Sequence, residues 1–338
     1  PEAHNPNRSA GHPAEGGSDL FNIRPGIAAR VRAAHAPARE RSAKGMSQAY
    51  KYKKVDAFTA DGSMGNPAAC LYLEPSQTLH EEQMLAIARQ HKGFVSEMVY
   101  CRKDAEGILL TYYSSECEVD FCGHGTIACL YGLIKDSPDL MKQKTIPVRT
   151  NKKGGLSIYN RIGEQDAVYI TAPEPEYLGT DLRAEDIAGK LGVRPYEIRP
   201  DLPVDRIDAG LRTLIVPLSG LQTEISIFPD ETELRLFCDA NGVDIILIFS
   251  LDTQNPASLA HTRVFAPKFG YLEDPATGSG NSAFGYYLLK NGLWDGRDCR
   301  IEQGGKDRVF NSVHLSTVNG AVVFGGSSTI RIEGAYYA

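Results

Sequence analysis

Cysteine, methionine and tryptophan are scarce in this sequence, and long apolar runs are missing from it. Its 338 residues include seven cysteines, five methionines and one tryptophan. The cysteines are odd in number and include no C-x-x-C pair, which argues against a disulfide framework and predicts reduced thiols. No apolar run approaches the roughly 20 residues of a membrane helix, and the start of the chain lacks a signal-peptide core. We therefore expect a cytoplasmic protein without a membrane partner.

A large excess of one charge sign is also absent. The chain has 36 basic and 42 acidic side chains, a formal net charge of -6, and no basic stripe. It thus lacks the electrostatic footprint of a nucleic-acid-binding protein, and we expect no nucleic-acid partner. With 42% hydrophobic and 23% charged residues, the composition excludes collagen, a coiled coil and a wholly disordered chain. The length fits two domains of ordinary size or one large one.

The composition divides the chain into segments. Residues 1–45 are dominated by Pro, Gly, Ala, Arg and Ser without strand alternation, so we expect a disordered or non-native extension there. The proline-spaced polar segment 171–176 is the best candidate for a domain linker. We therefore expect an N-terminal lobe over residues 46–172 and a C-terminal lobe over residues 173–325. A final strand, 326–338, follows and can return to the N-terminal lobe.

Strands and helices alternate irregularly in both halves. Apolar alternation predicts strands at residues 53–58, 68–73, 94–101, 108–115, 212–218, 245–249 and 262–266. Helical periodicity predicts helices at residues 123–134, 183–191, 231–241 and 281–291. A capping-box pattern of Thr78 with Glu81 predicts the start of another helix, which ends at Gly93. This mixed order is typical of an α+β fold with two similar halves.

One internal repeat stands out. Residues 122–128, CGHGTIA, align without a gap with residues 277–283, TGSGNSA, and an aromatic and leucine-rich helix follows each copy. Two glycine loops that each begin a helix offer backbone N–H groups and a helix dipole to an anion. Both copies also match the dinucleotide fingerprint G-x-G-x-x-A, but Gln143 stands where the first copy needs an acid. Two tight turns without a ligand are the plain alternative.

Three titratable residues accompany these loops. Strand alternation places Glu97 on the same face as three apolar neighbours, Val95, Val99 and Cys101, which makes it a candidate general acid or base. The alternative is an edge-strand carboxylate that reaches water. Asp274, three residues before Thr277, is a second catalytic carboxylate or a turn and cap residue. His124 stands between two glycines, where it could titrate near neutrality or merely cap or pack.

A zinc knuckle is a further possibility in the first loop. Cys117, Cys122, His124 and Cys129 lie close together in the sequence with the spacing C-x4-C-x-H-x4-C. This spacing lacks the close cysteine pair that usually holds one side of the ion. We therefore expect no metal there.

The motifs together resemble those of the phenazine-biosynthesis-like (PhzF-like) isomerase family, which is related to diaminopimelate epimerase. The resemblance runs from about residue 50 to the end of the chain. Its motifs lie at residues 55–59 (VDAFT), 65–69 (GNPAA), 96–97 (SE), 122–126 (CGHGT), 214–218 (LIVPL), 265–267 (FAP) and 273–280 (EDPATGSG).

The resemblance implies a diaminopimelate epimerase-like fold of two similar lobes, each a mixed β-barrel-like sheet around a central helix, with the active site between them. It places the acid-base glutamate at Glu97, the histidine at His124, and an aspartate and a serine at Asp274 and Ser279. It implies no cofactor and a homodimer. The two loops would then bind the substrate through Cys122, Gly123, Gly125, Thr126, Thr277, Gly278, Ser279, Gly280 and Asn281.

These features predict an isomerase that moves a proton on a small carboxylated substrate by general acid-base catalysis. The related epimerases use one cysteine in each loop, but here Cys122 has Thr277 as its counterpart, which disfavours a two-thiol racemase. Gly280, where relatives often carry alanine, leaves the substrate open. The alternatives are a lyase or dehydratase with Glu97 or Cys122 as its single base, and a non-catalytic dimeric binding module.

Overall fold

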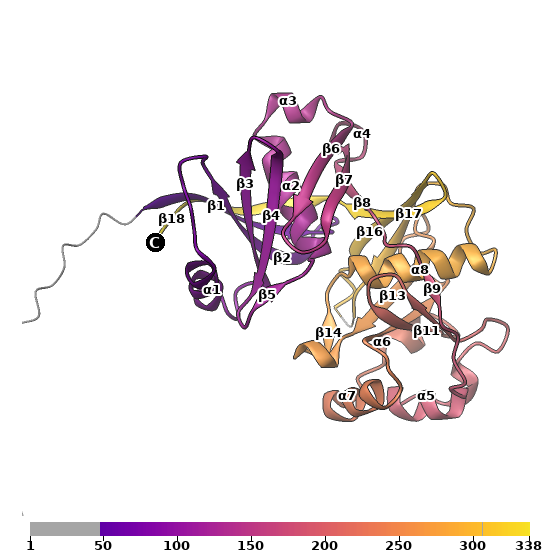
Figure 1. The fold of residues 1–338 in the computed structure, drawn as a ribbon. Coiled ribbons are helices and arrows are strands. Elements are labelled where there is room, and N and C mark those ends of the chain that lie inside the picture. Colours follow the sequence, from indigo (N-terminus) through magenta and orange to yellow (C-terminus); the bar gives the residue numbers. More distant parts are fainter. Residues whose placement is uncertain (1–47, 306) are drawn as a thin grey trace, which may run out of the picture. The chain divides into compact units, whose positions relative to one another are not determined.

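The computed structural model describes residues 48–305 and 307–338, which are drawn in colour in Figure 1. The extension expected over residues 1–45 lies outside the described residues. The described part is a mixed α/β structure that belongs to one compact unit, Ser47–Ala338. Its strands join into one large mixed sheet, and none of its helices is both long and apolar enough to cross a membrane.

The first half of the sheet contains eight strands. They are β1 (Ala49–Ala57), β2 (Asn66–Leu73), β3 (Glu97–Asp104), β4 (Gly107–Ser114), β5 (Glu118–Val119), β6 (Thr145–Thr150), β7 (Gly154–Arg161) and β8 (Ala167–Thr171). The pairings run β1-β2-β3-β4-β6-β7-β8, with β5 paired to β4. The pairs β2–β3 and β4–β6 are parallel, and the others are antiparallel.

The second half repeats this order. Its strands are β9 (Glu176–Tyr177), β10 (Asp205–Asp208), β11 (Arg212–Pro217), β12 (Ile245–Ser250), β13 (Ala260–Phe265), β14 (Glu273–Asp274), β15 (Cys299–Gln303), β16 (Asn311–Val318) and β17 (Ala321–Gly326). The pairings run β10-β11-β12-β13-β15-β16-β17, with β9 paired to β10 and β14 to β13, and again β11–β12 and β13–β15 are the parallel pairs. The two halves that carry the CGHGTIA and TGSGNSA repeats therefore also share the same order and direction of strand pairing.

Among the described residues, one strand pairing joins the two halves of the sheet, and the last strand returns to the first half. Strand β17 pairs antiparallel with β8, with Val323 opposite Thr171. The last strand, β18 (Ser328–Tyr337), pairs antiparallel with β1, and Figure 1 shows the yellow β18 beside the indigo β1.

Eight α-helices connect or cover the strands of the described part. They are α1 (Glu81–Gln90), α2 (Gly123–Lys135), α3 (Pro138–Met141), α4 (Ile162–Gln165), α5 (Ala184–Leu191), α6 (Leu221–Ile225), α7 (Glu231–Ala240) and α8 (Gly278–Lys290). Two single turns, η1 (Pro195–Glu197) and η2 (Pro267–Phe269), complete the set.

Helices α2 and α8 are the two buried ones. Helix α2 packs against β1, β2, β3, β8 and β18, and α8 packs against β10, β11, β12, β16 and β17. Most positions around both helices are buried, from Gly125 to Gly132 in α2 and from Gly280 to Leu288 in α8. A helix that is apolar on nearly every side is stable only inside such a shell of strands, which explains why these two sequences lack a charged face.

Several predicted boundaries differ from the structure, among them the starts of three elements. Helix α8 begins at Gly278 instead of 281, because the glycine loop itself forms the first helical turn after the N-cap residue Thr277. Strand β3 begins at Glu97 instead of 94, and Val95 packs with Met98 and Tyr100. The capping box of α1 is formed by His80 with Gln83 and not by Thr78 with Glu81, so the helix starts slightly later than its sequence pattern indicated.

Candidate active site

The first glycine loop forms the N-terminus of α2. Cys122 is the N-cap residue, and its Sγ accepts a hydrogen bond from the backbone N–H of Gly125 over 3.3 Å. Glycine is required at position 125, because a Cβ there would lie 2.8 Å from Val99 Cγ2 and 2.9 Å from Cys122 Sγ. Thr126 donates through Oγ1 to the Cys122 carbonyl over 2.7 Å and shares a 2.7 Å hydrogen bond with the Tyr112 hydroxyl. The first loop is thus held by hydrogen bonds to residues of the first half of the sheet and of α2.

The second glycine loop repeats this backbone. Thr277 is the N-cap residue of α8 with φ -118° and ψ 114°, close to the φ -134° and ψ 108° of Cys122. The amide of buried Gln303 accepts from the Thr277 N–H over 2.9 Å and from Asn281 Nδ2 over 2.7 Å. Its Nε2 donates to the Asp274 carbonyl over 2.9 Å and to Thr277 Oγ1 over 3.1 Å. One side chain from β15 therefore binds both ends of the second loop, at Asp274 and Thr277 and at Asn281.

The two loops meet at one aromatic ring. A Cβ added at Gly123 would lie 3.2 Å from Phe324 Cε2, and one added at Gly278 would lie 2.3 Å from the same atom. Phe324 belongs to β17, the strand that joins the two halves of the sheet. Both helix N-termini therefore approach each other across the Phe324 ring. First-turn N–H groups have no acceptor within their own helix, so this arrangement concentrates hydrogen-bond donors and positive dipole ends in one place.

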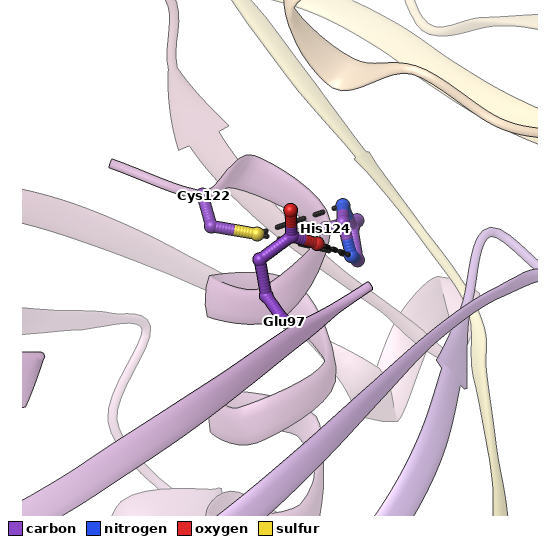
Figure 2. A group of neighbouring side chains, drawn as sticks. All are labelled: Glu97, Cys122 and His124. Atoms are coloured by element: carbon purple, nitrogen blue, oxygen red, sulfur yellow. Dashed lines mark hydrogen bonds and ion pairs between the residues drawn. The ribbon is translucent and has the colours of Figure 1, made fainter. Parts of the chain in front are cut away.

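Glu97, Cys122 and His124 form a compact cluster at the first loop (Figure 2). Glu97 is the first residue of β3, and its Oε2 lies 3.1 Å from His124 Nε2. The imidazole also contacts Cys122 Sγ, at 3.6 Å through Nδ1 and 3.8 Å through Nε2. The side chains of His124 and Glu97 are 14% and 19% exposed, so the cluster is largely desolvated and yet reachable.

Burial and charge shift the ionisation of this cluster. Burial raises the pKa of the Cys122 thiol, and the nearby His124 only partly offsets this, so the thiol keeps its proton at neutral pH. For His124, burial lowers the pKa, but the interactions with Cys122 and Glu97 outweigh burial, and the net pKa is well above its usual value. Since the thiol is neutral, we attribute the raised pKa of His124 to its ion pair with the Glu97 carboxylate.

Asp274 joins the cluster from the second half. Its Oδ1 accepts from Asn66 Nδ2 over 2.8 Å, and its Oδ2 accepts from Thr277 Oγ1 over 2.5 Å. Burial, with a smaller contribution from Glu97, raises the pKa of Asp274 to about 6 against the opposing effects of His124, Thr277 and Asn66. The charges of Glu97 and His124, which belong to the first half, therefore act on Asp274 in the second half.

The predicted binding residues differ in how accessible they are. Cys122, Gly123, Gly125, Thr126, Thr277, Gly278, Ser279, Gly280 and Asn281 all lie at the two helix N-termini. Asn281 is fully buried and donates to the Thr277 carbonyl over 2.9 Å as well as to Gln303, so its side chain positions the loop. Ser279 is partly exposed at the loop. A four-residue zinc knuckle is not assembled, because Cys117 is exposed whereas Cys129 is fully buried.

Sequence reasoning missed three residues of the site. Asn66, which holds Asp274, lies in a Gly-Asn-Pro motif that indicated only a turn and a family resemblance. Gln303 carries no local signal, because it reaches the loop through the pairing of β15 with β13. Burial, followed by the charges of Asp274, Glu97 and Cys122, raises the pKa of Tyr271, which places its hydroxyl in the electrostatic environment of the cluster.

A match to a family model agrees with this architecture. The model for phenazine biosynthesis-like proteins, PhzC-PhzF, matches residues 55–334, so the chain belongs to this family. The Bacillus subtilis protein "Uncharacterized isomerase YfhB" is 31% identical over 263 residues, which are 75% of this chain and 87% of that protein. Relatives named as isomerases recur in Escherichia coli, and the chain is an isomerase of this family.

Solved structures share the fold. The Bacillus anthracis phenazine biosynthesis protein of the PhzF family gives a TM-score of 0.72 at 23% identity, covering 86% of this chain and 99% of that one. A hydroxyproline epimerase from Agrobacterium vitis, solved with bound trans-4-hydroxy-L-proline, gives a TM-score of 0.53 at 13% identity, covering 86% and 92%. At these identities the likeness concerns the fold alone.

Proposed function

We propose that this isomerase moves a proton between two positions of a small carboxylated substrate by general acid-base catalysis, without a cofactor. The substrate would bind in a cleft between two lobes, each formed by one half of the sheet around α2 or α8. The observation that carries the proposal is the meeting of Glu97 and His124 with Asp274 beside two helix N-termini. The matching pairing orders of the two halves support the two-lobed arrangement.

The substrate carboxylate would accept hydrogen bonds from the first-turn N–H groups of α2 and α8. Glu97 takes a proton from the adjacent carbon, and the negative charge that develops on the substrate is stabilised by these N–H groups and by the His124 imidazolium. Asp274, whose pKa is about 6, carries a proton in a substantial fraction of molecules near that pH. The proton then returns to another carbon of the same molecule, so the step is redox-neutral and needs no co-substrate.

A racemase with one thiol on each face is not supported by the second loop. The Thr277 hydroxyl occupies the position opposite Cys122, donates to Asp274 over 2.5 Å and accepts from Gln303 over 3.1 Å. A hydroxyl held in this way orients a carboxylate and is too weakly acidic to exchange protons with carbon. The homodimer implied by the family resemblance stays a prediction, which size-exclusion chromatography with light scattering would test.

Replacement of Glu97 by Gln is the direct test. Glutamine keeps the size and polarity of the side chain but cannot take up the proton, so solvent exchange should fall by about 100- to 10,000-fold. NMR of deuterium incorporation, with a panel of cyclic and amino-acid carboxylates, identifies a substrate and measures the rate. Glu116→Gln is the matched control, since Glu116 is an exposed carboxylate paired with Lys92. A Glu97→Gln variant that keeps more than about a tenth of the rate would exclude Glu97 as the base.

A further inference from the structure

The cluster at the first loop combines three kinds of metal ligand. One donor atom each from Glu97, Cys122 and His124 lies within 4.8 Å of the other two. In the parts of the chain that the structure describes, this is the one such group of three or more His, Cys, Asp or Glu residues. It differs from the four-residue zinc motif considered on sequence grounds, because the third ligand comes from β3.

The spacing of the donors fits a tetrahedral cation. Zinc lies about 2.3 Å from sulfur and about 2.0 to 2.2 Å from nitrogen or oxygen, so tetrahedral angles require about 3.6 Å between sulfur and nitrogen and about 3.4 Å between nitrogen and oxygen. Here Cys122 Sγ lies 3.8 Å from His124 Nε2, and His124 Nε2 lies 3.1 Å from Glu97 Oε2. Both separations are within a few tenths of an ångström of the required values. Because Cys122 Sγ also lies 3.6 Å from His124 Nδ1, the imidazole must turn so that the Nε2 lone pair faces the cation.

We propose that Glu97, Cys122 and His124 form a three-ligand site for a thiophilic divalent cation such as Zn²⁺ or Co²⁺, and that the bound cation inhibits the enzyme. The inhibitory part rests on the proposed function, since the cation occupies the oxygen of Glu97 that would take up the proton. The binding part does not depend on it. Sites with three protein ligands leave a fourth position for water or a substrate oxygen.

Two surrounding features favour such a site. The N–H of Gly125 donates to Cys122 Sγ over 3.3 Å and holds the sulfur in place at the helix N-terminus, and the thiol releases its proton when the cation binds. Glu97 Oε2 is buried and, within the described residues, lacks a hydrogen-bond partner other than the close His124 ring. A buried carboxylate oxygen with spare acceptor capacity gains most from a cation.

Cobalt absorption spectroscopy and zinc calorimetry on the full chain test the binding. Co²⁺ should produce a thiolate-to-cobalt charge-transfer band at one equivalent, and Zn²⁺ should displace it. Cys122→Ser should lose more than the roughly 10- to 100-fold in affinity that the loss of an outer-shell partner costs, because a ligand itself is removed. Cys117→Ser, which changes an exposed thiol outside the cluster, should bind like the unchanged protein.

A His124→Gln variant serves as a second probe of the same site. It should also lose the cobalt band. If Cys122→Ser fails to fold, the His124→Gln variant still tests whether the band depends on this cluster. Absence of a stoichiometric cobalt band, or a band that survives in Cys122→Ser but disappears in Cys117→Ser, would overturn the site.

Activity measurements separate this inference from the proposed function. Zn²⁺ should inhibit deuterium exchange, and EDTA should restore it. Stimulation by Zn²⁺ would refute the inhibitory role while leaving the site in place. If Co²⁺ binds as described but Glu97→Gln still exchanges deuterium, only the proposed function fails. If Glu97→Gln is inactive but Co²⁺ does not bind, only the metal site fails.

Discussion

The two glycine loops share a backbone and differ in chemistry. Cys122 and Thr277 cap α2 and α8 with closely similar dihedral angles, and Gly123 and Gly278 approach the same Phe324 ring. In the first loop, Glu97 and His124 remain partly exposed beside a thiol. In the second, the buried Gln303 amide uses its hydrogen bonds on the loop itself.

We interpret this difference as a division of roles between the two loops. The first loop places groups that can exchange protons at the cluster. The second loop is held by buried hydrogen bonds from Gln303 and, in the proposed mechanism, positions Asp274 as well as binding the substrate carboxylate. If this is right, changes behind the second loop should damage stability more than equivalent changes behind the first.

The largest difference is expected on removing Gln303. In Gln303→Leu, the buried Thr277 N–H and Asp274 carbonyl lose their partner, which should lower the free energy of unfolding by about 4 kcal/mol. Tyr112→Phe removes the hydroxyl that bonds Thr126 behind the first loop and should cost only about 1 kcal/mol. Urea denaturation of both variants measures the two values. Equal losses of unfolding free energy in the two variants would contradict the view that the second loop is held more firmly than the first.

A smaller difference is expected for the two glycines at Phe324. Gly278→Ala places a Cβ 2.3 Å from the Phe324 ring and should destabilise the protein by about 2 kcal/mol through overpacking. Gly123→Ala places it 3.2 Å away, and the helix propensity of alanine, worth about 1 kcal/mol over glycine, should offset most of the strain. Thermal unfolding of the pair provides the comparison. A Gly123→Ala variant that is less stable than Gly278→Ala would mean that the Phe324 ring packs more tightly against the first loop than against the second.

The smallest effect is a pH dependence that belongs to the second loop. The pKa of Asp274 is raised to about 6 in the folded protein, so its stabilising contribution is full below the unfolded value near 3.8 and is lost as pH rises through about 6. Because Asp274 is partly exposed, we expect a loss of about 1 kcal/mol. Asp274→Asn should remove this loss, whereas Asp61→Asn, at an exposed carboxylate, should not. Unfolding curves from about pH 3.5, just below the unfolded pKa, to about pH 7.5, above the folded pKa, measure this loss.

The sequence predicted what depends on local patterns. The repeat indicated that a helix follows each glycine loop, although the start predicted at residue 281 was three residues late. Strand alternation correctly grouped Glu97 with Val99 and Cys101 on the side facing α2. The same rule failed for Val95, because β3 begins only at Glu97 and the chain before it follows a different path.

Contacts between distant segments were beyond such patterns. Gln303 reaches Thr277 because β15 pairs with β13, and Phe324 lies between the two loops because β17 pairs with β8. Both depend on strand register across long sequence separations, and neither residue type signals its partner locally. The same holds for Asn66, whose bond to Asp274 spans 208 positions.

The pairing of β1 with β18 constrains how the protein can be made. Strand β1 is synthesised before β2 to β17, whereas one of its two neighbours, Ser328–Tyr337, is synthesised after all of them. Until then, that edge of β1 has unpaired N–H and C=O groups and can pair with a strand of another nascent chain. The first half can therefore assemble its interior during synthesis but completes its sheet only afterwards. Slow translation over the second half prolongs the period in which this edge of β1 is unpaired. A chaperone that covers the edge during this period would lower the risk of aggregation.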